Sequence, residues 1–303
     1  MTASVSAALR IALSRCDVAH FHAEGPCAML WLPKLFGKKC VVTIHGLDWQ
    51  RSKWGGFASR YIKFGERTAA RHADEIIVLS KGVQQYFRDT YGRNTCLIPN
   101  GVSRPVLKPP RLIRDQYGLH KDGYVLFLGR IVPEKGIQYL LEAWKSIKTD
   151  KKLVIAGGSS DTEAFLHELK DMTEGDTSFI FTGFVQGEML EELYSNAYVY
   201  CLPSDLEGMP LSLLEAMSYG NCCLTSDIPE CADVVEDHGV TFPKGNVRVL
   251  RDRLQMLLDD TAAVERCRAS AADYICQKYS WDYMAEKTLD VYRHLSSGKL
   301  EGE

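Results

Sequence analysis

Short apolar runs recur along the chain and predict buried strands. Most of them lack strict alternation of apolar and polar residues, as is typical of strands covered by helices on both faces. Stretches with helical periodicity lie between the runs, and this α/β alternation predicts parallel sheets with right-handed crossovers. The expected strands are 18–22, 40–44, 75–79, 95–98, 124–128, 152–155, 178–182, 197–201, 222–225 and 240–242. The expected helices include 57–72, 135–147, 162–172, 187–195, 212–219 and 279–295.

A proline-rich stretch, 100–110, predicts a boundary between two domains. Four strand runs precede it and six follow, so the first part looks like the second half of a doubly wound domain, whereas the second part looks complete. The first fifteen residues have the pattern of an amphipathic helix. We therefore expect an incomplete N-terminal Rossmann-like domain at 1–108, a C-terminal one at 109–278 and a terminal helical segment at 279–303.

The composition is that of a water-soluble globular protein, with 303 residues, 46% of them hydrophobic and 25% charged. The net charge of −3 argues against a general nucleic-acid binder. The ten cysteines include no C-x-x-C pair, and several lie in apolar runs, so reduced thiols in a cytoplasmic protein are expected. No apolar run approaches the ~20 residues that span a bilayer.

Two glutamates, Glu207 and Glu215, mark the loop and helix that follow the run at 197–201. A helix N-terminus after a parallel strand binds anions through its free amides, and ligands of open α/β sheets sit at this edge. Carboxylates beside such a site suit the hydroxyls of a ribose or a sugar. Taken alone, Ser212 and Glu215 also fit a capping box, which is the commoner structural interpretation.

Two cations five residues apart, Arg130 and Lys135, follow the run at 124–128. At the carboxyl end of a strand they suit a pyrophosphate, which Arg binds with paired hydrogen bonds and Lys as a point charge. For a lone Arg or Lys, a solvated loop position is the default interpretation.

His45 ends the run at 40–44 and precedes a glycine, and a structural hydrogen bond is the favoured interpretation for a lone histidine there. His20 and His22 lie on one face of the first run. No third ligand is near them in the sequence, so we expect no metal site there.

Taken together, these segments resemble the group 1 (family 4) glycosyltransferases of the GT-B fold. Glu207 and Glu215 stand at the ends of an E-x7-E signature, and Gly129 to Gly136 match the G-R-x-x-x-x-K-G element. The stretch His45-Gly-Leu-Asp-Trp-Gln-Arg51 resembles a bacterial polysaccharide or rhamnosyltransferase-like branch. The resemblance covers roughly residues 17–295. A complete first domain of this family opens with a Gly-rich turn that nothing before Val18 supplies, so we expect an N-terminal truncation of roughly 70–80 residues.

The resemblance implies two Rossmann-like domains facing a cleft, with the terminal helix crossing back to the first. It implies a retaining transfer of a sugar from a nucleotide diphosphate, and roles for the residues that match. The implied catalytic residues are His45, Arg130, Lys135 and Glu207. The implied donor-binding residues are Gly129, Arg130, Lys135, Gly158, Val185, Gly208, Met209, Leu211, Ser212 and Glu215. For the turns at Gly158 and Val185, a plain tight turn is an equally good interpretation.

No D-x-D pair is present, so we expect no metal and no cofactor, with cations and helix amides neutralising the leaving diphosphate. Family frequency favours UDP as the carrier. Double displacement needs two carboxylates about 5 Å apart. No certain nucleophile is visible, and we expect front-face transfer instead.

A cell-surface polysaccharide or a lipid-linked precursor is the expected acceptor, with peripheral contact at the inner membrane face. Three alternatives stay open. The chain could be a nucleotide-sugar-binding module or a partner subunit without turnover. It could be an epimerase-like or phosphorylase-like enzyme of the same architecture. A nicotinamide oxidoreductase is disfavoured because no G-x-G-x-x-G fingerprint is present.

Overall fold

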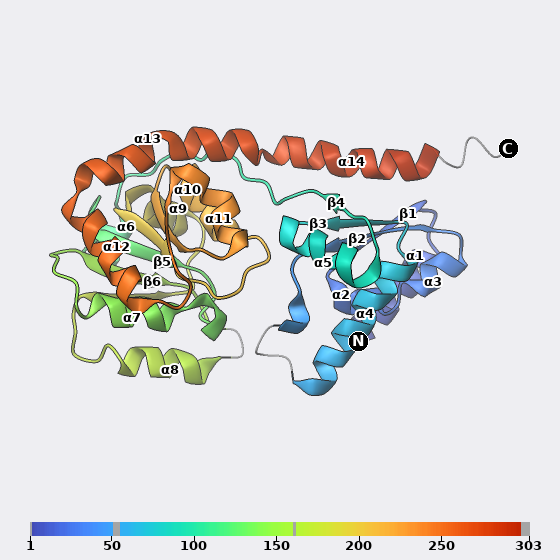
Figure 1. The fold of residues 1–303 in the computed structure, drawn as a ribbon, viewed down its shortest axis with the longest axis horizontal. Coiled ribbons are helices and arrows are strands. Elements are labelled where there is room, and N and C mark those ends of the chain that lie inside the picture. Colours follow the sequence, from blue (N-terminus) through green and yellow to red (C-terminus); the bar gives the residue numbers. More distant parts are fainter. Residues whose placement is uncertain (1, 51–54, 160–161, 298–303) are drawn as a thin grey trace. The chain divides into compact units, whose positions relative to one another are not determined.

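The computed structural model describes residues 2–50, 55–159 and 162–297. It divides into two compact units, one formed by 1–101 with 281–303 and the other by 102–280. Each unit contains a wholly parallel sheet with helices packed on it (Figure 1). This arrangement confirms the predicted α/β class with two parallel-sheet domains.

The first unit has four strands in the order β1-β2-β3-β4. The strands are β1 (Val18–His22), β2 (Lys39–Ile44), β3 (Glu75–Val78) and β4 (Cys96–Leu97). The helices are α1 (Thr2–Ala12), α2 (Glu24–Cys27), α3 (Trp31–Leu35), η1 (Asp48–Gln50), α4 (Gly56–His72), α5 (Lys81–Tyr91) and α14 (Trp281–Ser297).

The two faces of this sheet are covered differently. One face packs into an apolar core with α2, α4 and α5, built from residues such as Val42, Ile44, Ala69 and Phe87. The other face looks toward α14, which runs along it (Figure 1). A cavity of about 470 Å³ lies between that face and α14. The strands alternate as a pleated sheet must, so neighbouring residues of one strand point to opposite faces.

The second unit has six strands in the order β10-β9-β8-β5-β6-β7. The strands are β5 (Tyr124–Leu128), β6 (Lys152–Ala156), β7 (Phe179–Gly183), β8 (Val199–Leu202), β9 (Cys222–Ser226) and β10 (Val240–Phe242). The helices are α6 (Leu112–Tyr117), η2 (Pro133–Lys135), α7 (Ile137–Trp144), α8 (Glu163–Asp171), α9 (Glu188–Asn196), α10 (Leu211–Ser218), α11 (Pro229–Val235), η3 (Glu236–His238), α12 (Val247–Asp259) and α13 (Thr261–Lys278).

Helices cover both faces of the six-stranded sheet, α7, α8 and α12 on one side and α9, α10 and α13 on the other (Figure 1). The chain starts the sheet at β5, moves outward to β6 and β7, and returns to β8 beside β5. The strand order therefore reverses between β5 and β8, which is where open α/β sheets bind ligands.

Two expected helices begin later than the sequence pattern indicated. The helix expected at 135–147 is interrupted at Gly136, whose φ is +66°, so that α7 begins only at Ile137. The helix expected at 279–295 begins at Trp281, because the carbonyl of Tyr279 accepts a hydrogen bond from the amide of Val102 at 2.7 Å. In both places a local backbone demand overrides the periodic pattern.

Candidate active site

The two sequence motifs of the second unit meet at the point where its strand order reverses. The G-R-x-x-x-x-K-G element follows β5 and the E-x7-E segment follows β8. These strands are direct neighbours, with Val125 paired to Val199 and Leu126 to Tyr200. Both motifs therefore leave the sheet at the same edge, although about 70 residues separate them in the sequence.

Lys135 and Glu207 form a buried ion pair at this edge. The Lys135 Nζ lies 2.6 Å from the Glu207 Oε1, and the two side chains are 11% and 8% exposed. The hydroxyl of Ser204 donates a second hydrogen bond to the same oxygen, also at 2.6 Å. A charged pair this deeply buried is stable only while both partners are present. The pair therefore ties the loop after β5 to the loop after β8.

Gly136 allows these loops to approach. Its backbone is left-handed, and a Cβ built on it would lie 2.0 Å from the carbonyl oxygen of Pro203. Only glycine fits both demands. The glycine that closes the G-R-x-x-x-x-K-G element thus lets Lys135 reach Glu207.

Arg130 lies at the same edge, half-buried, at the end of β5. Among the described residues its guanidinium has no ion-pair or side-chain hydrogen-bond partner. The contrast with Lys135 matters, because a guanidinium offers five N–H donors in a fork that matches a phosphate. Arg130 can supply those donors to a ligand without first breaking a contact within the described part of the chain.

The turns after β6 and β7 lie at the same edge of the sheet. A Cβ at Gly157 would lie 1.8 Å from the carbonyl oxygen of Gly129, so the backbones touch there. The amide of Ile131 donates to the carbonyl of Gly158 at 3.0 Å. Val185 is half-buried in the loop after β7. These contacts fix the path of the backbone around Gly129 and Arg130.

The structure corrects the capping-box interpretation of Ser212. Helix α10 begins at Leu211, one residue before the predicted start, and Pro210 occupies the N-cap position without a side-chain cap. The Ser212 oxygen instead accepts a hydrogen bond from the Tyr200 hydroxyl at 2.9 Å. The Tyr200 hydroxyl has a single proton and also lies 3.1 Å from the Leu128 carbonyl, so the Ser212 hydroxyl can act as a donor as well as an acceptor. The first amides of a helix have no acceptor within the helix, so those of Leu211 and Ser212 add to this donor set.

Glu215 is half-buried and held by a tyrosine from α9. The Tyr194 hydroxyl donates to the Glu215 Oε2 at 3.0 Å and also reaches the Ser212 carbonyl at 3.2 Å. Burial raises the pKa of Glu215, while the Tyr194 hydrogen bond acts in the opposite direction. The carboxylate is therefore oriented as an acceptor. Of the other residues expected here, Gly208 is buried, Met209 is half-buried and Leu211 is exposed.

His45 belongs to the first unit, where it meets His20 and His22. The His22 Nδ1 lies 3.0 Å from the His45 Nε2, and their rings stack with centroids 5.3 Å apart. His22 also stacks on His20 at 4.4 Å. His20 is held by the Thr43 hydroxyl at 2.8 Å and by the Tyr292 hydroxyl of α14 at 2.5 Å. Sequence reasoning placed two imidazoles on one face but did not find the third.

Burial, together with the charges of His22 and His45, lowers the pKa of His20 to about 4. His20 is therefore neutral at physiological pH.

Within 2–50, 55–159 and 162–297, no group of three His, Cys, Asp or Glu residues is arranged to hold a metal ion. All ten cysteines are free thiols in this structure. No helix of the described ranges is long and apolar enough to cross a bilayer.

The contacts that sequence reasoning missed are long-range partners. Glu215 is positioned by Tyr194, Ser212 by Tyr200 and Glu207 by Ser204. Each of these partners lies in or next to a strand or helix. A tyrosine in a buried strand usually carries its hydroxyl to a polar partner. The pattern Tyr198-Val-Tyr200 at the end of a predicted strand was therefore the one usable signal.

Cations and carboxylates thus lie together at the switch point of the second unit, which suits a ligand that carries both phosphates and hydroxyls. The second unit matches the family described as glycosyl transferases group 1 over residues 111–274. The first matches the Glycosyltransferase Family 4 over residues 1–104. The chain belongs to the group 1 glycosyltransferases, which have the GT-B fold.

The sequence is similar to those of named glycosyltransferases over much of its length. An alpha-maltose-1-phosphate synthase from Mycolicibacterium smegmatis is 27% identical over 290 residues, covering 87% of this chain and 75% of the synthase. The O-antigen chain mannosyltransferase B of Escherichia coli is 28% identical over 191 residues, covering 60% of this chain and 49% of that enzyme.

Solved structures share the fold. A sucrose-phosphate synthase from Thermosynechococcus elongatus superposes with a TM-score of 0.84 at 24% identity, covering 96% of this chain and 76% of that one. HepE of Anabaena in complex with UDP and glucose gives a TM-score of 0.85 at 16% identity, covering 96% of this chain and 81% of that one.

Proposed function

We propose that this chain is a retaining, metal-independent glycosyltransferase that moves a sugar from a UDP-linked donor to a glycan or a lipid-linked glycan. The observation that carries the proposal is the polar set at the β5–β8 switch point. It combines Arg130, which has no partner among the described residues, with the buried Lys135–Glu207 pair. A set that is partly self-neutralised and still offers one guanidinium suits a ligand carrying phosphates beside a neutral sugar.

Each residue takes the role that its contacts support. Arg130 and Lys135 stabilise charge as it develops on the departing diphosphate. The Ser212 hydroxyl and the first amides of α10 bind phosphate oxygens. Glu215, oriented by Tyr194, accepts hydrogen bonds from the ribose hydroxyls. Glu207 binds the sugar, and His45 positions the sugar and supports the transition state.

The remaining expected donor contacts come from backbone and apolar groups. Gly129, Gly158 and Val185 lie near the strand ends. Gly208 and Met209 lie in the loop that leads into α10, and Leu211 is the first residue of that helix. Gly129 and Gly158 leave room for a ligand close to the backbone, whereas the Gly129 carbonyl occupies the Cβ position of Gly157. Such contacts carry no charge and suit the base and the carrier sugar.

The proposed reaction breaks the bond between the anomeric carbon and the diphosphate oxygen, and forms a bond from that carbon to an acceptor hydroxyl oxygen. The acceptor proton passes to the leaving diphosphate, which departs as the nucleoside diphosphate. Attack on the face that the diphosphate leaves retains the anomeric configuration. Glu207 is already engaged by Lys135 and Ser204 through Oε1, which favours a binding role over a nucleophilic one.

UDP is proposed as the carrier because HepE, which shares this fold, has been solved with UDP and with UDP-glucose. The acceptor class is proposed partly from relatives such as the O-antigen chain mannosyltransferase. We place the reaction in the cytoplasm, at the inner face of the membrane.

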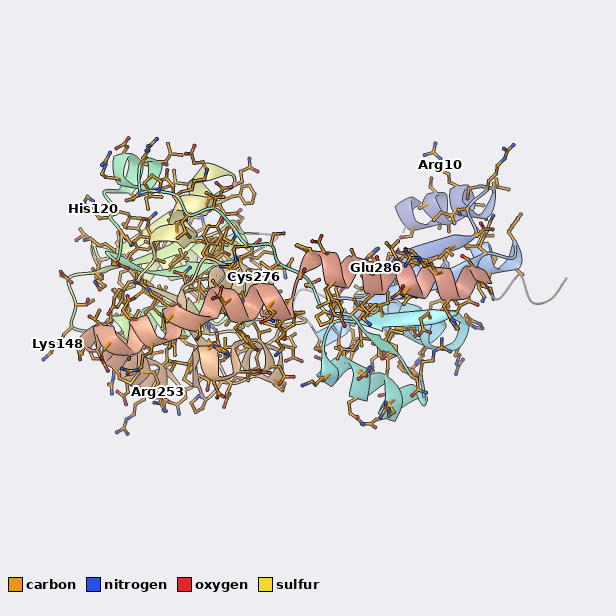
Figure 2. The ribbon with its side chains drawn as sticks, turned by 90° about the horizontal axis from the view of Figure 1, so that it is seen from above. Arg10, His120, Lys148, Arg253, Cys276 and Glu286 are labelled. Atoms are coloured by element: carbon orange, nitrogen blue, oxygen red, sulfur yellow. The ribbon has the colours of Figure 1, made fainter. Side chains whose placement is uncertain are left out.

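The surface of α1 and α3 supports peripheral membrane contact. These neighbouring helices expose large apolar side chains, with Leu9 47%, Trp31 48% and Leu35 74% exposed. Arg10 lies on α1 and points outward (Figure 2). Exposed apolar groups flanked by cations suit the surface of an anionic bilayer. Sedimentation with vesicles of phosphatidylglycerol should carry the chain down, and a Leu9→Ser, Leu35→Ser variant should stay in solution.

The transfer itself is tested by incubating the chain with a panel of nucleotide sugars and a lipid-linked glycan extract, with and without EDTA. We expect nucleoside diphosphate release from UDP-sugars that EDTA does not reduce, and an NMR coupling that shows the donor's anomeric configuration in the product. Inverted product, or release only with added Mg²⁺, would contradict the mechanism. Nucleotide binding without any turnover would instead favour a binding module, and a free epimer would favour an epimerase.

A further inference from the structure

The three histidines of the first unit form one connected array on a single face of its sheet. In the parallel register of β1 and β2, His22 is the partner of Thr43, and His45 follows two residues later on the same face. The rings therefore stack in the order His20, His22, His45. They border the cavity of about 470 Å³ under α14.

One end of the array is fixed. Both ring nitrogens of His20 are hydrogen-bonded: Nε2 to the hydroxyl of Thr43 on β2, and Nδ1 to the hydroxyl of Tyr292 on α14. Because it is neutral and doubly hydrogen-bonded, its ring cannot turn without losing a contact. His22 rests on this ring with an interplanar angle of 25°. Stacking on a fixed ring limits the orientations of an otherwise exposed side chain.

The other end of the array is a contact between two imidazoles. The His22 Nδ1 and the His45 Nε2 are 3.0 Å apart, so one nitrogen must carry a proton and the other a lone pair. A neutral imidazole has a single N–H. The location of the shared proton therefore decides whether Nδ1 of His45 is a donor or an acceptor.

The described lining of the cavity is mostly apolar. Its described lining contains neither Asp, Glu, Lys nor Arg. Among the described lining residues, the titratable groups are the three imidazoles and the phenol of Tyr292, and Thr43 and Thr288 add hydroxyls. Among the described lining residues, His22 brings a ring nitrogen within hydrogen-bond distance of the His45 Nε2, so it is placed to orient that ring.

We propose that His22 is a positioning residue for His45: through the Nδ1–Nε2 hydrogen bond it fixes the orientation and the tautomer of the His45 ring. The proposal rests on the proposed role of His45 in sugar transfer. His20 and Tyr292 support it indirectly, because they hold the ring on which His22 stacks.

Two substitutions separate hydrogen bonding from packing. In His22→Asn the amide stands near the place of Nδ1 and can keep the hydrogen bond, whereas in His22→Phe the ring still stacks but cannot bond. We expect His22→Phe to lower kcat about 10- to 100-fold with little change in donor KM, and His22→Asn to stay within about threefold of the wild type. His120→Phe, at the surface of the second unit, is the matched control (Figure 2).

A second readout does not depend on activity. In chain labelled with ¹⁵N at histidine, a hydrogen bond between the two rings gives a scalar coupling between His22 Nδ1 and His45 Nε2, and one dominant tautomer of His45. The coupling should disappear in His22→Phe and the tautomer should become mixed.

The outcomes divide cleanly. Absence of the coupling in the wild type overturns the proposal, as does a His22→Phe variant with wild-type kcat or a His22→Asn variant as impaired as His22→Phe. A wild-type chain that shows the coupling and the single tautomer but transfers no sugar would overturn the proposed function, while the positioning of His45 by His22 would stand.

Discussion

Charged side chains lie together at one edge of the six-stranded sheet of the second unit, whereas three imidazoles lie together on one face of the four-stranded sheet of the first unit. At the β5–β8 edge, Lys135 and Glu207 are paired and almost fully buried. In the first unit, His20, His22 and His45 contact one another, and burial holds the pKa of His20 near 4. The two sets of side chains therefore differ in charge, and each suits a different kind of ligand group.

The difference fits the role that we propose for each set. A leaving diphosphate gains negative charge during transfer, and fixed cations in a water-poor site lower its energy. A sugar ring carries only hydroxyls, which neutral imidazoles can hydrogen-bond without an added charge. The comparison implies that removing a cation from the second unit should cost more than removing an imidazole from the first.

The largest expected effect is that of Lys135→Ala. It removes a cation from the leaving group and leaves Glu207 buried without its ion-pair partner. We expect kcat to fall about 1,000-fold, and the second unit to lose about 3–5 kcal/mol of its free energy of unfolding. Chemical denaturation and steady-state kinetics measure the two effects.

A double variant separates these effects. Lys135→Met with Glu207→Met replaces the pair by apolar side chains, which should restore most of the stability but none of the activity. A Lys135→Ala variant that is as stable and as active as the wild type would show that the pair has no structural or catalytic importance.

Arg130→Ala should show the opposite balance. Because Arg130 has no partner among the described residues, its removal should leave the free energy of unfolding within about 0.5 kcal/mol of the wild type. We expect kcat to fall about 100-fold. Arg253→Ala, which removes an exposed cation of the same unit, is the control (Figure 2). Equal activity in the two variants would remove Arg130 from the proposed site.

A smaller effect is expected at Glu215. In Glu215→Gln the side chain keeps its size but loses its charge, and charge-assisted hydrogen bonds are stronger than neutral ones. We expect donor affinity to fall about tenfold with kcat nearly unchanged. Tyr194→Phe should cause a weaker loss of the same kind, because Glu215 then loses its orienting hydroxyl. A fall in kcat at constant affinity would assign Glu215 to the reacting centre instead.

The smallest effect concerns pH and the first unit. The pKa of His20 is about 4 in the folded chain and ordinarily about 6.5, so the unfolded state binds more protons between these values. Stability should therefore fall as the pH is lowered from 6.5 to 4, by about 1 kcal/mol once solvent screening of this half-buried ring is considered. Hydrogen exchange of the β1 amides measures it, and the dependence should flatten in His20→Gln. An unchanged slope in that variant would mean that folding does not lower the pKa of His20.

Much of the fold could be predicted because apolar runs report burial directly. All ten expected strands are present, and their order along the chain indicates parallel sheets. The ends of the helices were harder to predict. Gly136 interrupts an otherwise helical pattern because a left-handed backbone is needed where it meets Pro203, and a periodic pattern does not report that contact.

For the candidate site, the sequence indicates the motifs that have a local spacing and does not indicate the contacts that depend on pairing between distant segments. The G-R-x-x-x-x-K-G and E-x7-E segments are local and were found. The capping box was wrong because Tyr200 and Tyr194, from β8 and α9, take the polar groups of Ser212 and Glu215. The histidine array depends on the register of β1 against β2, which the sequence does not state.

The central claim is that the β5–β8 edge of the second unit binds a nucleoside diphosphate through Arg130 and Lys135. Calorimetric titration with UDP, GDP, ADP and dTDP, with and without EDTA, tests it most directly when the Arg130→Ala, Lys135→Ala variant is measured beside the wild type. The account predicts selective binding of UDP that EDTA does not weaken and that the double variant loses. A folded wild-type chain that binds no nucleotide, or a double variant that binds UDP as tightly as the wild type, would contradict it.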